Sequence, residues 1–350
     1  MQIKKLLSYL EEIAPPSLQE SYDNAGLIVG DPKVDIEGVL ICLDSTEAVI
    51  DEAIQLGCNL VIAHHPIVFK GLKRLNGKNY VERTVMKAIK NDIAIYAIHT
   101  NLDNVYYKGV NSAIAEQLGL VDTQILAPKG RAKKLITFVA PDQMEPLRKA
   151  LLDAGAGAVS GFRDLTYASL GVGTRDGSGG AQVKLEVVYA AHQERSLVSA
   201  LLKAHPEAHV PYDIIATENK VMEIGSGMIG KLEEPMNEKD FLAHLKSVMG
   251  AGCVRYTRLR RRKVRKVAVC GGSGGFLLQT AIARGADIFV TADYKYHEFF
   301  DADGRIVIAD IGHYESEQFT IQLLHEIISN KFSIFAAHCT KVNTNPVYYL

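Results

Sequence analysis

Two stretches of the 350-residue sequence decide the fold: residues 39–65, VLICLDSTEAVIDEAIQLGCNLVIAHH, and residues 267–293, VAVCGGSGGFLLQTAIARGADIFVTAD. Each begins with an apolar run, continues with helical spacing and ends in a second apolar run. That order is typical of a β-α-β unit, in which the two strands are parallel. The two stretches align without a gap at a constant shift of 228 residues.

Several identities support this internal repeat. Cys42 aligns with Cys270, Ser45 with Ser273, and the pair AI at 53–54 with AI at 281–282. All β-α-β units share a pattern whatever their ancestry, but paired identities favour duplication. We therefore predict an α/β protein whose core consists of two related halves.

Each half supplies one further strand that ends in polar residues. The apolar run 93–98 leads into HTNLD, and the run 305–309 leads into DIGH. In open α/β sheets, binding sites form at the carboxyl ends of the strands. We therefore expect the functional site where these strand ends meet.

The segment between the halves has a different character. We expect strands at 135–140, 162–172, 183–190 and 209–215, helices at 144–154 and 195–204, and a loose loop at 173–180. The order βαβ-βαβ is the ferredoxin-like pattern. The prediction is one discontinuous domain, residues 1–127 and 223–350, with an inserted α+β domain at residues 128–222.

Composition excludes several classes of protein. The net charge of −1 gives no general attraction for nucleic acid or an anionic membrane. No apolar run approaches the roughly 18 residues of a membrane span, and the first residues do not resemble a signal peptide. The five scattered cysteines contain no Cys-x-x-Cys pair, so we expect reduced, buried thiols in a cytoplasmic protein.

Two histidines and an aspartate in the first half are candidate metal ligands. A turn at the end of a strand can aim His64 and His65 at one point; the alternative is a capped strand with one exposed imidazole. Asp103 follows His99 by four residues and could bridge two cations, orient an imidazole or form an Asx turn.

The second half offers His313 and Glu317, which precede the helical spacing of residues 318–328. Residues four apart share a helix face, as one imidazole and one carboxylate ligand of a metal would. The same residues also suit a plain helix N-terminus, where acidic side chains complement the dipole.

Convergence of these groups favours a site over separate structural roles. Three imidazoles and two carboxylates suit Zn, Mn, Fe, Co or Ni rather than an all-oxygen Ca or Mg site. A bridging aspartate would hold two ions roughly 3.5 to 4 Å apart. We predict about two divalent ions per subunit, bound by His64, His65, Asp103, His313 and Glu317.

Two further histidines are candidates for proton transfer. His99 and His297 could act as general acid or base, since imidazole titrates near neutral pH, or could only orient other groups. Asp293 and Lys295 could line the same pocket.

Two other motifs leave alternatives open. Residues 271–275, GGSGG, could hold a phosphate at a helix N-terminus or form a tight strand-to-helix turn. The basic run 255–266 could be a solvated loop, a nucleic-acid patch or a source of cations for a substrate's phosphates.

Four motifs resemble the Nif-three-like family, catalogued as GTP cyclohydrolase I type 2 homologues: YDNAGL at 22–27, AHHPI at 63–67, HTNLD at 99–103 and GHYESE at 312–317. The resemblance implies a dinuclear site at the five positions, two related α/β halves and a toroidal homohexamer. The insert looks like the PII/CutA-like domain of longer members. Ala292 stands where the family often has glycine, and the side chain of alanine makes the turn stiffer than glycine would.

The sequence therefore predicts a metal-dependent hydrolase for a small anionic substrate that is nucleotide-like or phosphorylated. The alternative is a non-catalytic assembly or regulatory protein whose PII-like insert senses a ligand or partner. An exchangeable water on the metals favours the first and a closed coordination shell the second. We expect neither a nucleic-acid nor a membrane partner.

Overall fold

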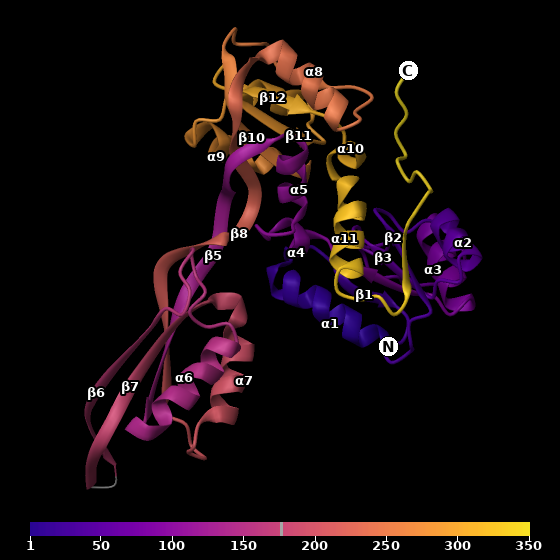
Figure 1. Ribbon diagram of the computed structural model, residues 1–350. Helices are drawn as coiled ribbons and strands as arrows, with labels where there is room; N and C mark the ends of the chain where they lie inside the picture. The colour runs from indigo at the N-terminus through magenta and orange to yellow at the C-terminus, as the bar shows by residue number, and fades with distance from the viewer. Residues whose placement is uncertain (176–177) are drawn as a thin grey trace. The chain divides into compact units, whose positions relative to one another are not determined.

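The computed structural model describes residues 1–175 and 178–350, which divide into two compact units (Figure 1). The larger unit comprises Met1–Ala127 and Gly225–Leu350, and the smaller unit comprises Pro128–Ile224. Two long strands, β5 (Leu120–Val139) and β8 (Tyr212–Asn237), contribute residues to both units.

The first sheet of the larger unit has the strand order β1-β4-β3-β2-β13. Its strands are β1 (Gly26–Val29), β2 (Gly38–Cys42), β3 (Leu60–Ala63), β4 (Ala94–Ala97) and β13 (Ala336–Cys339). All neighbours are parallel except β1, which is antiparallel to β4. Every residue of β2, β3 and β4 is buried, which explains their continuous apolar sequences.

The second sheet of this unit continues from β8 in the order β8-β10-β11-β12-β9. Its further strands are β9 (Arg255–Tyr256), β10 (Lys263–Ser273), β11 (Ile288–Ala292) and β12 (Val307–Asp310). The central strands β10, β11 and β12 are parallel, and antiparallel strands flank them on both sides.

The internal repeat is confirmed at the level of strand register. Val39 pairs with Leu60 in the first sheet, and the aligned Val267 pairs with Ile288 in the second. The connecting helices are α2 (Glu47–Gln55) and α9 (Leu278–Ala283). Aligned residues therefore hold the same positions over the first three pairs, before the register of β10 shifts after Val269. The predicted α/β class with two parallel β-α-β units is correct.

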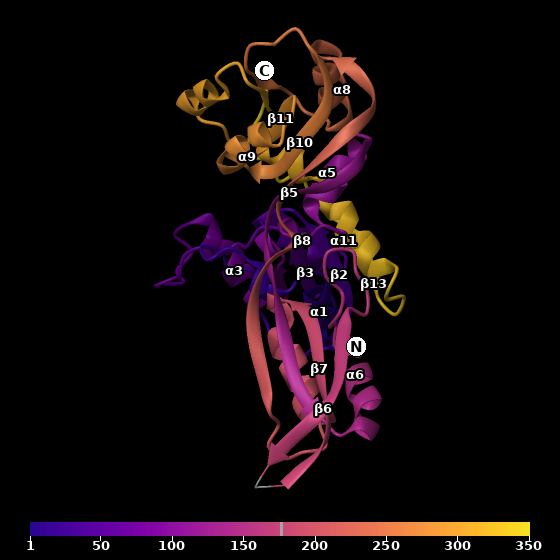
Figure 2. The ribbon, with the colours of Figure 1, turned by 90° about the vertical axis from the view of Figure 1, so that its left-hand side faces the viewer.

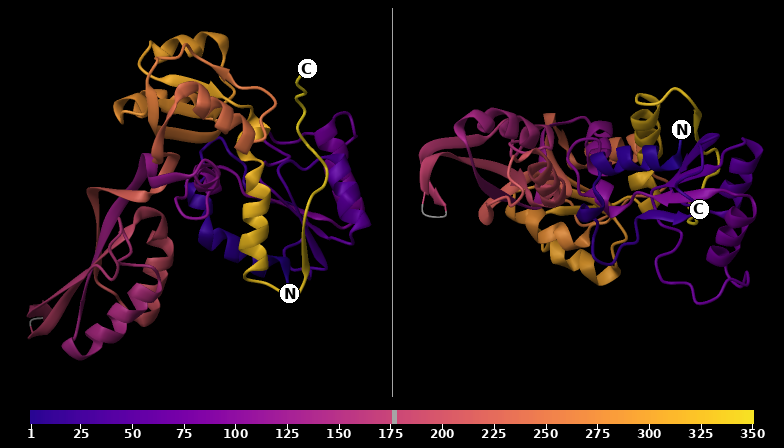
Figure 3. Two further views of the ribbon diagram at one scale, coloured as in Figure 1. Left: turned by 45° about the horizontal axis from the view of Figure 1, so that its top comes forward. Right: turned by 90° about the horizontal axis from the view of Figure 1, so that it is seen from below.

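Helices cover these sheets and bury their apolar faces. They are α1 (Ile3–Ile13), α3 (Tyr80–Lys90), α4 (Thr100–Asp103), α5 (Val110–Gln117), α8 (Glu238–Val248), α10 (His313–Glu317) and α11 (Phe319–Ser329). Helix α11 packs beside α5 and against β2 and β13 (Figure 3). Its buried Leu324 and Ile328 join Leu6 and Leu10 of α1 in one apolar core. Across the described ranges, no helix is long and apolar enough to cross a membrane.

The smaller unit follows the predicted order of elements. After β5 come α6 (Met144–Asp153), β6 (Thr166–Arg175), β7 (Ser178–Ala190) and α7 (Glu194–Ala204), and β8 follows. Strand β7 is antiparallel to both β5 and β6 (Figure 2). Leu147 and Leu151 of α6 pack with Leu197 and Leu201 of α7 against the sheet, which gives this unit its own apolar core.

Two expectations for the smaller unit need correction. Strands β6 and β7 reach into the expected loop, with Gly173 paired to Gly180; positions 176 and 177 lie outside the described residues. Strands β5 and β8 are much longer than the expected strands at 135–140 and 209–215. The sequence pattern did not reveal their full length, because polar and apolar residues mix along them and Pro128 and Gly130 resemble a turn.

The cysteines only partly match the expectation of buried thiols. All five lie among the described residues, and none forms a disulfide. Cys42, Cys58 and Cys270 are buried as predicted. Cys253 is exposed because it lies in the loop between α8 and β9, and Cys339 is half-buried at the end of the edge strand β13.

Candidate metal centre

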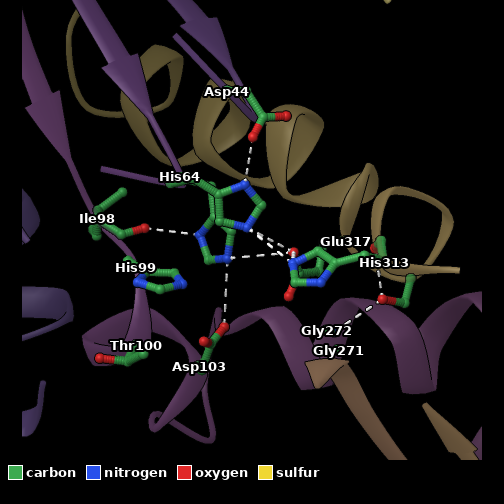
Figure 4. A network of polar contacts seen from close by, with 12 residues as sticks. Asp44, His64, Ile98, His99, Thr100, Asp103, Gly271, Gly272, His313 and Glu317 are labelled. Carbon is green, nitrogen blue, oxygen red and sulfur yellow. Dashed lines mark hydrogen bonds and ion pairs between the residues drawn. The ribbon is translucent and has the colours of Figure 1, made fainter. Parts of the chain in front are cut away.

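Four histidines and two carboxylates converge at the carboxyl ends of the parallel strands of the larger unit (Figure 4). His64 and His65 follow β3, His99 precedes α4, and Asp103 ends that helix. His313 and Glu317 are the first and last residues of α10, which follows β12. The structure thus brings together His99 and the five residues that the sequence singles out as metal ligands.

The pair on α10 has the geometry expected of residues four apart. His313 Nε2 lies 3.1 Å from Glu317 Oε2. These residues occupy a short helix of their own, and the next helix, α11, begins at Phe319. Gly312 precedes α10 with φ of +93°, a conformation that favours glycine.

Every histidine of the cluster is oriented through its Nδ1 atom. Nδ1 of His64, His65, His99 and His313 contacts, respectively, the carbonyl of Ile98 at 2.8 Å, Asp44 at 2.8 Å, Asp23 at 2.8 Å and Asp293 at 2.6 Å. An acceptor at Nδ1 fixes the proton there and leaves Nε2 for a ligand, as in the carboxylate–histidine–metal arrangement.

The Nε2 atoms and the carboxylates form three overlapping groups. These are His65, His313 and Glu317; His64, Asp103 and Glu317; and His64, His65 and His99, with ligand atoms in each group within 4.8 Å of one another. Glu317 belongs to two groups and Asp103 to one. Glu317 is thus the residue that the two groups containing a carboxylate have in common.

Two buried atoms indicate that this arrangement suits a cation. His64 Nε2 and Asp103 Oδ1 lie 3.6 Å apart, and among the described residues neither has a hydrogen-bond partner. With its proton on Nδ1, His64 presents a lone pair to a carboxylate oxygen. Two facing polar atoms without a hydrogen-bond partner are costly to bury, and a metal ion would satisfy both. These His and Glu groups can therefore bind metal ions.

The pKa values of the histidines differ with their surroundings. Burial lowers the pKa of His64 to about 3, so its imidazole is neutral. Burial also disfavours the charge on His65, but hydrogen bonds to Asp44 and Glu317 outweigh it and raise the pKa to about 9. Burial likewise disfavours the charge on His313, but the charge of Glu317 and the hydrogen bonds to Asp293 and Glu317 together outweigh it and raise the pKa to about 11.

The pKa values of the two carboxylates of the cluster, Glu317 and Asp103, shift in opposite directions. Burial raises the pKa of Glu317, but the charge of His313 and hydrogen bonds from His313 and His65 hold it well below its usual range. Burial and the charge of Glu317 raise the pKa of Asp103 well above its usual range. Binding of a divalent cation at this cluster should therefore release protons.

The glycine-rich segment 271–275 packs closely against the carboxylate of Glu317. A Cβ atom on Gly272, whose φ is +59°, would lie 2.5 Å from Glu317 Oε1. The N–H groups of Gly271, Gly272 and Gly274 already donate to side chains of Asn111, Ser316 and Thr291. Of the two open interpretations, the structure favours a close-packed strand-to-helix turn over a phosphate cradle.

A pocket of about 730 Å³ opens onto the cluster. Its wall includes His65, His99, Asp103, His313 and Glu317. Several of its lining side chains are exposed aromatics: Tyr22, Phe69, Tyr80, Phe276 and Tyr349. The lining of the pocket therefore combines polar side chains of metal-ligand type with exposed aromatic side chains.

The basic run is not one solvated loop. Arg255 lies in β9, lines the pocket and forms an ion pair with Asp310, which is buried at the end of β12. The backbone N–H groups of Arg260 and Arg261 donate to Glu238 at the start of α8. The last four residues of the run, from Lys263, begin strand β10. Arg255 is thus the member of the run that contributes to the wall of the pocket.

Of the remaining candidates from the sequence, Asp293 lies in the pocket wall, whereas Lys295 and His297 do not. Asp293 lines the pocket and holds His313. His297 is exposed on the 3-10 segment Tyr296–Ala302, with its ring against Tyr296 and Phe300. Neither His297 nor Lys295 belongs to the described wall of the pocket. The structure brings His99 to the cluster but not His297.

Sequence reasoning missed two orienting carboxylates, Asp44 and Asp23. Asp44 follows β2, which neighbours β3, so the strand-end rule that selected His65 would have selected it too. Asp23 also bonds Thr100; burial raises its pKa, but the hydrogen bonds from His99 and Thr100 lower it to about 2. It belongs to the YDNAGL motif, which was the signal available for it.

Comparison with known proteins identifies the family. The family model Duf34/NIF3 (NGG1p interacting factor 3) matches residues 1–346. Relatives from Halalkalibacterium halodurans and Bacillus subtilis, both named GTP cyclohydrolase 1 type 2 homolog, are each 34% identical over 99% of this chain and 98% of their own length. The crystal structure of a Bacillus cereus protein related to NIF3 matches with a TM-score of 0.88 and 37% identity over 100% of this chain and 99% of that chain.

The chain therefore belongs to the Duf34/NIF3 family, which confirms the resemblance seen in the four motifs. The mixed α/β fold with two sheets agrees with that of its NIF3-related neighbour.

Proposed function

We propose that the protein binds two divalent metal ions in this pocket and hydrolyses a small nucleotide-like or phosphorylated molecule. The observation that carries the proposal is the pair of buried, facing polar atoms, His64 Nε2 and Asp103 Oδ1, beside a pocket large enough for a small molecule. We assign one ion to His65, His313 and Glu317 and the other to His64, Asp103 and Glu317. The donor set suits zinc and its borderline neighbours Mn, Fe, Co and Ni.

We assign the following roles in hydrolysis to residues around the two proposed ions. Divalent ions at such a site lower the pKa of water to about 7 and stabilise negative charge on substrate oxygens. His99 lines the pocket, and Asp23 holds its Nδ1, so His99 can accept or donate a proton at Nε2. Asp44 and Asp293 hold His65 and His313 in the orientation that binding requires.

The wall of the pocket supports a substrate with a planar ring and a negative charge. Exposed aromatic side chains such as Phe69 and Tyr80 offer faces on which a base can stack. Arg255 places a guanidinium in the same wall. The name shared by the curated relatives points to the same nucleotide-like class.

The test of this function combines metal analysis with a screen for hydrolysis. Protein purified without added metal should contain about two divalent ions per chain. The loaded protein should then hydrolyse a member of a panel of nucleotides and phosphoesters, and removal of metal with a chelator should abolish turnover. Full metal content without turnover on any member would instead favour the assembly or regulatory alternative.

Nucleic acid is not the partner that we propose. Replacing Arg260, Arg261 and Arg262 by serine should leave metal content unchanged, because Arg255 is the residue of this run in the pocket wall. Duplex and single-stranded DNA should bind only weakly to either protein at physiological salt. Submicromolar binding that falls steeply with salt and disappears in the triple variant would contradict this expectation.

We also propose, from the family resemblance, that the chain assembles as a toroidal homohexamer and that Pro128–Ile224 is a PII/CutA-like domain. The βαββαβ order and the separate apolar core of that unit support the second part. We expect a variant that joins Ala127 to Gly225 through a short glycine linker to retain its metal content. Light scattering should show that it also retains the size of a hexamer. Aggregation or loss of metal would show that the smaller unit belongs to the main core.

A further inference from the structure

The segment that follows β13 enters the metal site. Strand β13 runs parallel to β2, and β2 runs parallel to β3, so all three end at the edge that carries His64 and His65. Residues after β13 therefore leave the sheet beside the cluster. Asn345, Pro346 and Val347 form part of the pocket wall.

This segment is anchored to the first half before it reaches the pocket. The N–H of Thr340 donates to the carbonyl of Ile41 at 2.9 Å and extends the pairing of β13 with β2. The Thr340 hydroxyl bonds the carboxylate of Glu52 on α2, and Val342 packs against the apolar cluster beneath that helix. The path of the chain is thus set by contacts outside the metal site.

The next contact reaches a residue that orients a proposed ligand. The hydroxyl of Thr344 donates to Asp44 Oδ2 at 2.8 Å. The other oxygen of the same carboxylate, Oδ1, contacts His65 Nδ1 at 2.8 Å. On the far side of its ring, His65 Nε2 lies 2.9 Å from Glu317 Oε2. Thr344, Asp44 and His65 thus form a continuous chain of hydrogen bonds that ends at the metal cluster.

The neighbouring residue makes a matching contact with the second half. Asn345 Nδ2 donates to Glu315 Oε1 at 3.0 Å, and Glu315 lies on α10 between His313 and Glu317. Thr344 therefore contacts a residue of the first half, and Asn345 contacts a residue of the second half. Thr344 is the one whose contact leads directly to a proposed ligand.

We propose that Thr344 is a positioning residue for the metal site, a proposal that rests on the function proposed above. The Asp44 side chain is 37% exposed, so without a second partner its carboxylate is free to rotate into solvent. The Thr344 hydroxyl fixes the carboxylate plane, and the fixed carboxylate sets the orientation of the His65 ring. Groups that orient metal ligands in this way contribute to metal affinity without touching the ion.

The test uses the full-length, metal-free protein titrated with Co²⁺ in the presence of a competing chelator. Thr344→Val keeps the size and β-branching of the side chain but removes the donor. We expect the affinity for one of the two ions to fall about 10-fold, the lower end of the loss caused by removing an orienting partner. Thr344→Ser restores the hydroxyl and should restore the affinity. Thr340→Val is the matched control: it removes a hydroxyl of the same segment that bonds Glu52 instead of Asp44, and it should bind as wild type.

A double-mutant cycle separates positioning from general stability. On an Asp44→Ala background, Thr344→Val should cause no further loss of Co²⁺ affinity, because the hydroxyl acts only through that carboxylate. Equal losses in the Thr344 and Thr340 variants, additive losses with Asp44→Ala, or unchanged affinity in Thr344→Val would each overturn the proposal while leaving the metal site intact. Absence of Co²⁺ binding by the wild-type protein would overturn the metal site itself and this proposal with it.

Discussion

Glu317→Gln should reduce the metal content of the protein from about two ions per chain to well below one, the largest loss expected from any single ligand substitution. Glu317 is the carboxylate common to the two proposed metal groups, and its side chain is only 3% exposed. Glutamine has nearly the same shape but carries no charge, so both ions lose a carboxylate ligand. Elemental analysis of protein purified without added metal measures the effect.

Two variants serve as comparisons for Glu317→Gln. Glu315→Gln changes a buried glutamate of the same helix that belongs to none of the three groups, and it should retain both ions. Asp103→Asn should lose about one ion, because Asp103 belongs to a single group. If Asp103→Asn lost both ions and Glu317→Gln only one, the shared carboxylate would be Asp103, as the sequence had suggested.

Gly272→Ala should destabilise the fold and weaken metal binding together. A methyl group there would lie 2.5 Å from Glu317 Oε1, and φ of +59° is unfavourable for any residue with a Cβ. The left-handed conformation alone costs about 1–2 kcal/mol, and displacement of a buried carboxylate adds to it. We expect a loss of about 3 kcal/mol in the free energy of unfolding, measured by urea denaturation, with a lower metal content.

Gly285→Ala is the matched control for this substitution. Gly285 has φ of +70°, similar to that of Gly272, but a Cβ atom there meets no heavy atom within 4 Å. This variant should lose only the conformational part, about 1–2 kcal/mol, and should bind metal normally. Equal losses in the two alanine variants would mean that contact with Glu317 has no part in the effect.

The sequence was informative wherever burial dictates a pattern. Leu60 and Ile62 of β3 lie between parallel strands, so their run is apolar throughout, and the first polar residues after it, His64 and His65, had to lie at the edge of the sheet. The same reasoning located Asp103, and helical spacing paired His313 with Glu317. One rule of topology and one of helix geometry therefore singled out all five candidate ligands, and the family resemblance favoured a joint site over separate structural roles.

Other features depend on partners that no local pattern reveals. Asp44 and Thr344 are three hundred positions apart, and only the pairing of β13 with β2 brings them together. His297 follows its strand by the same logic as Asp293, but the backbone turns away after Asp293, whose φ is +58°, and carries His297 to the surface. Which carboxylate the two proposed ions would share also depends on distances that spacing along the chain cannot supply.

The pairing of β13 with β2 has a consequence for biosynthesis. Strand β2 ends at Cys42, and the strand that covers its open edge does not begin until Ala336. At roughly 5 to 20 residues per second, a ribosome needs tens of seconds to synthesise the intervening chain. During that time the nascent first half presents an unpaired, wholly apolar edge, which is a site for aggregation. Glu317 also lies late in the sequence, so the nascent protein cannot complete its proposed metal centre until that residue has emerged, or its first sheet until Ala336–Cys339 has emerged.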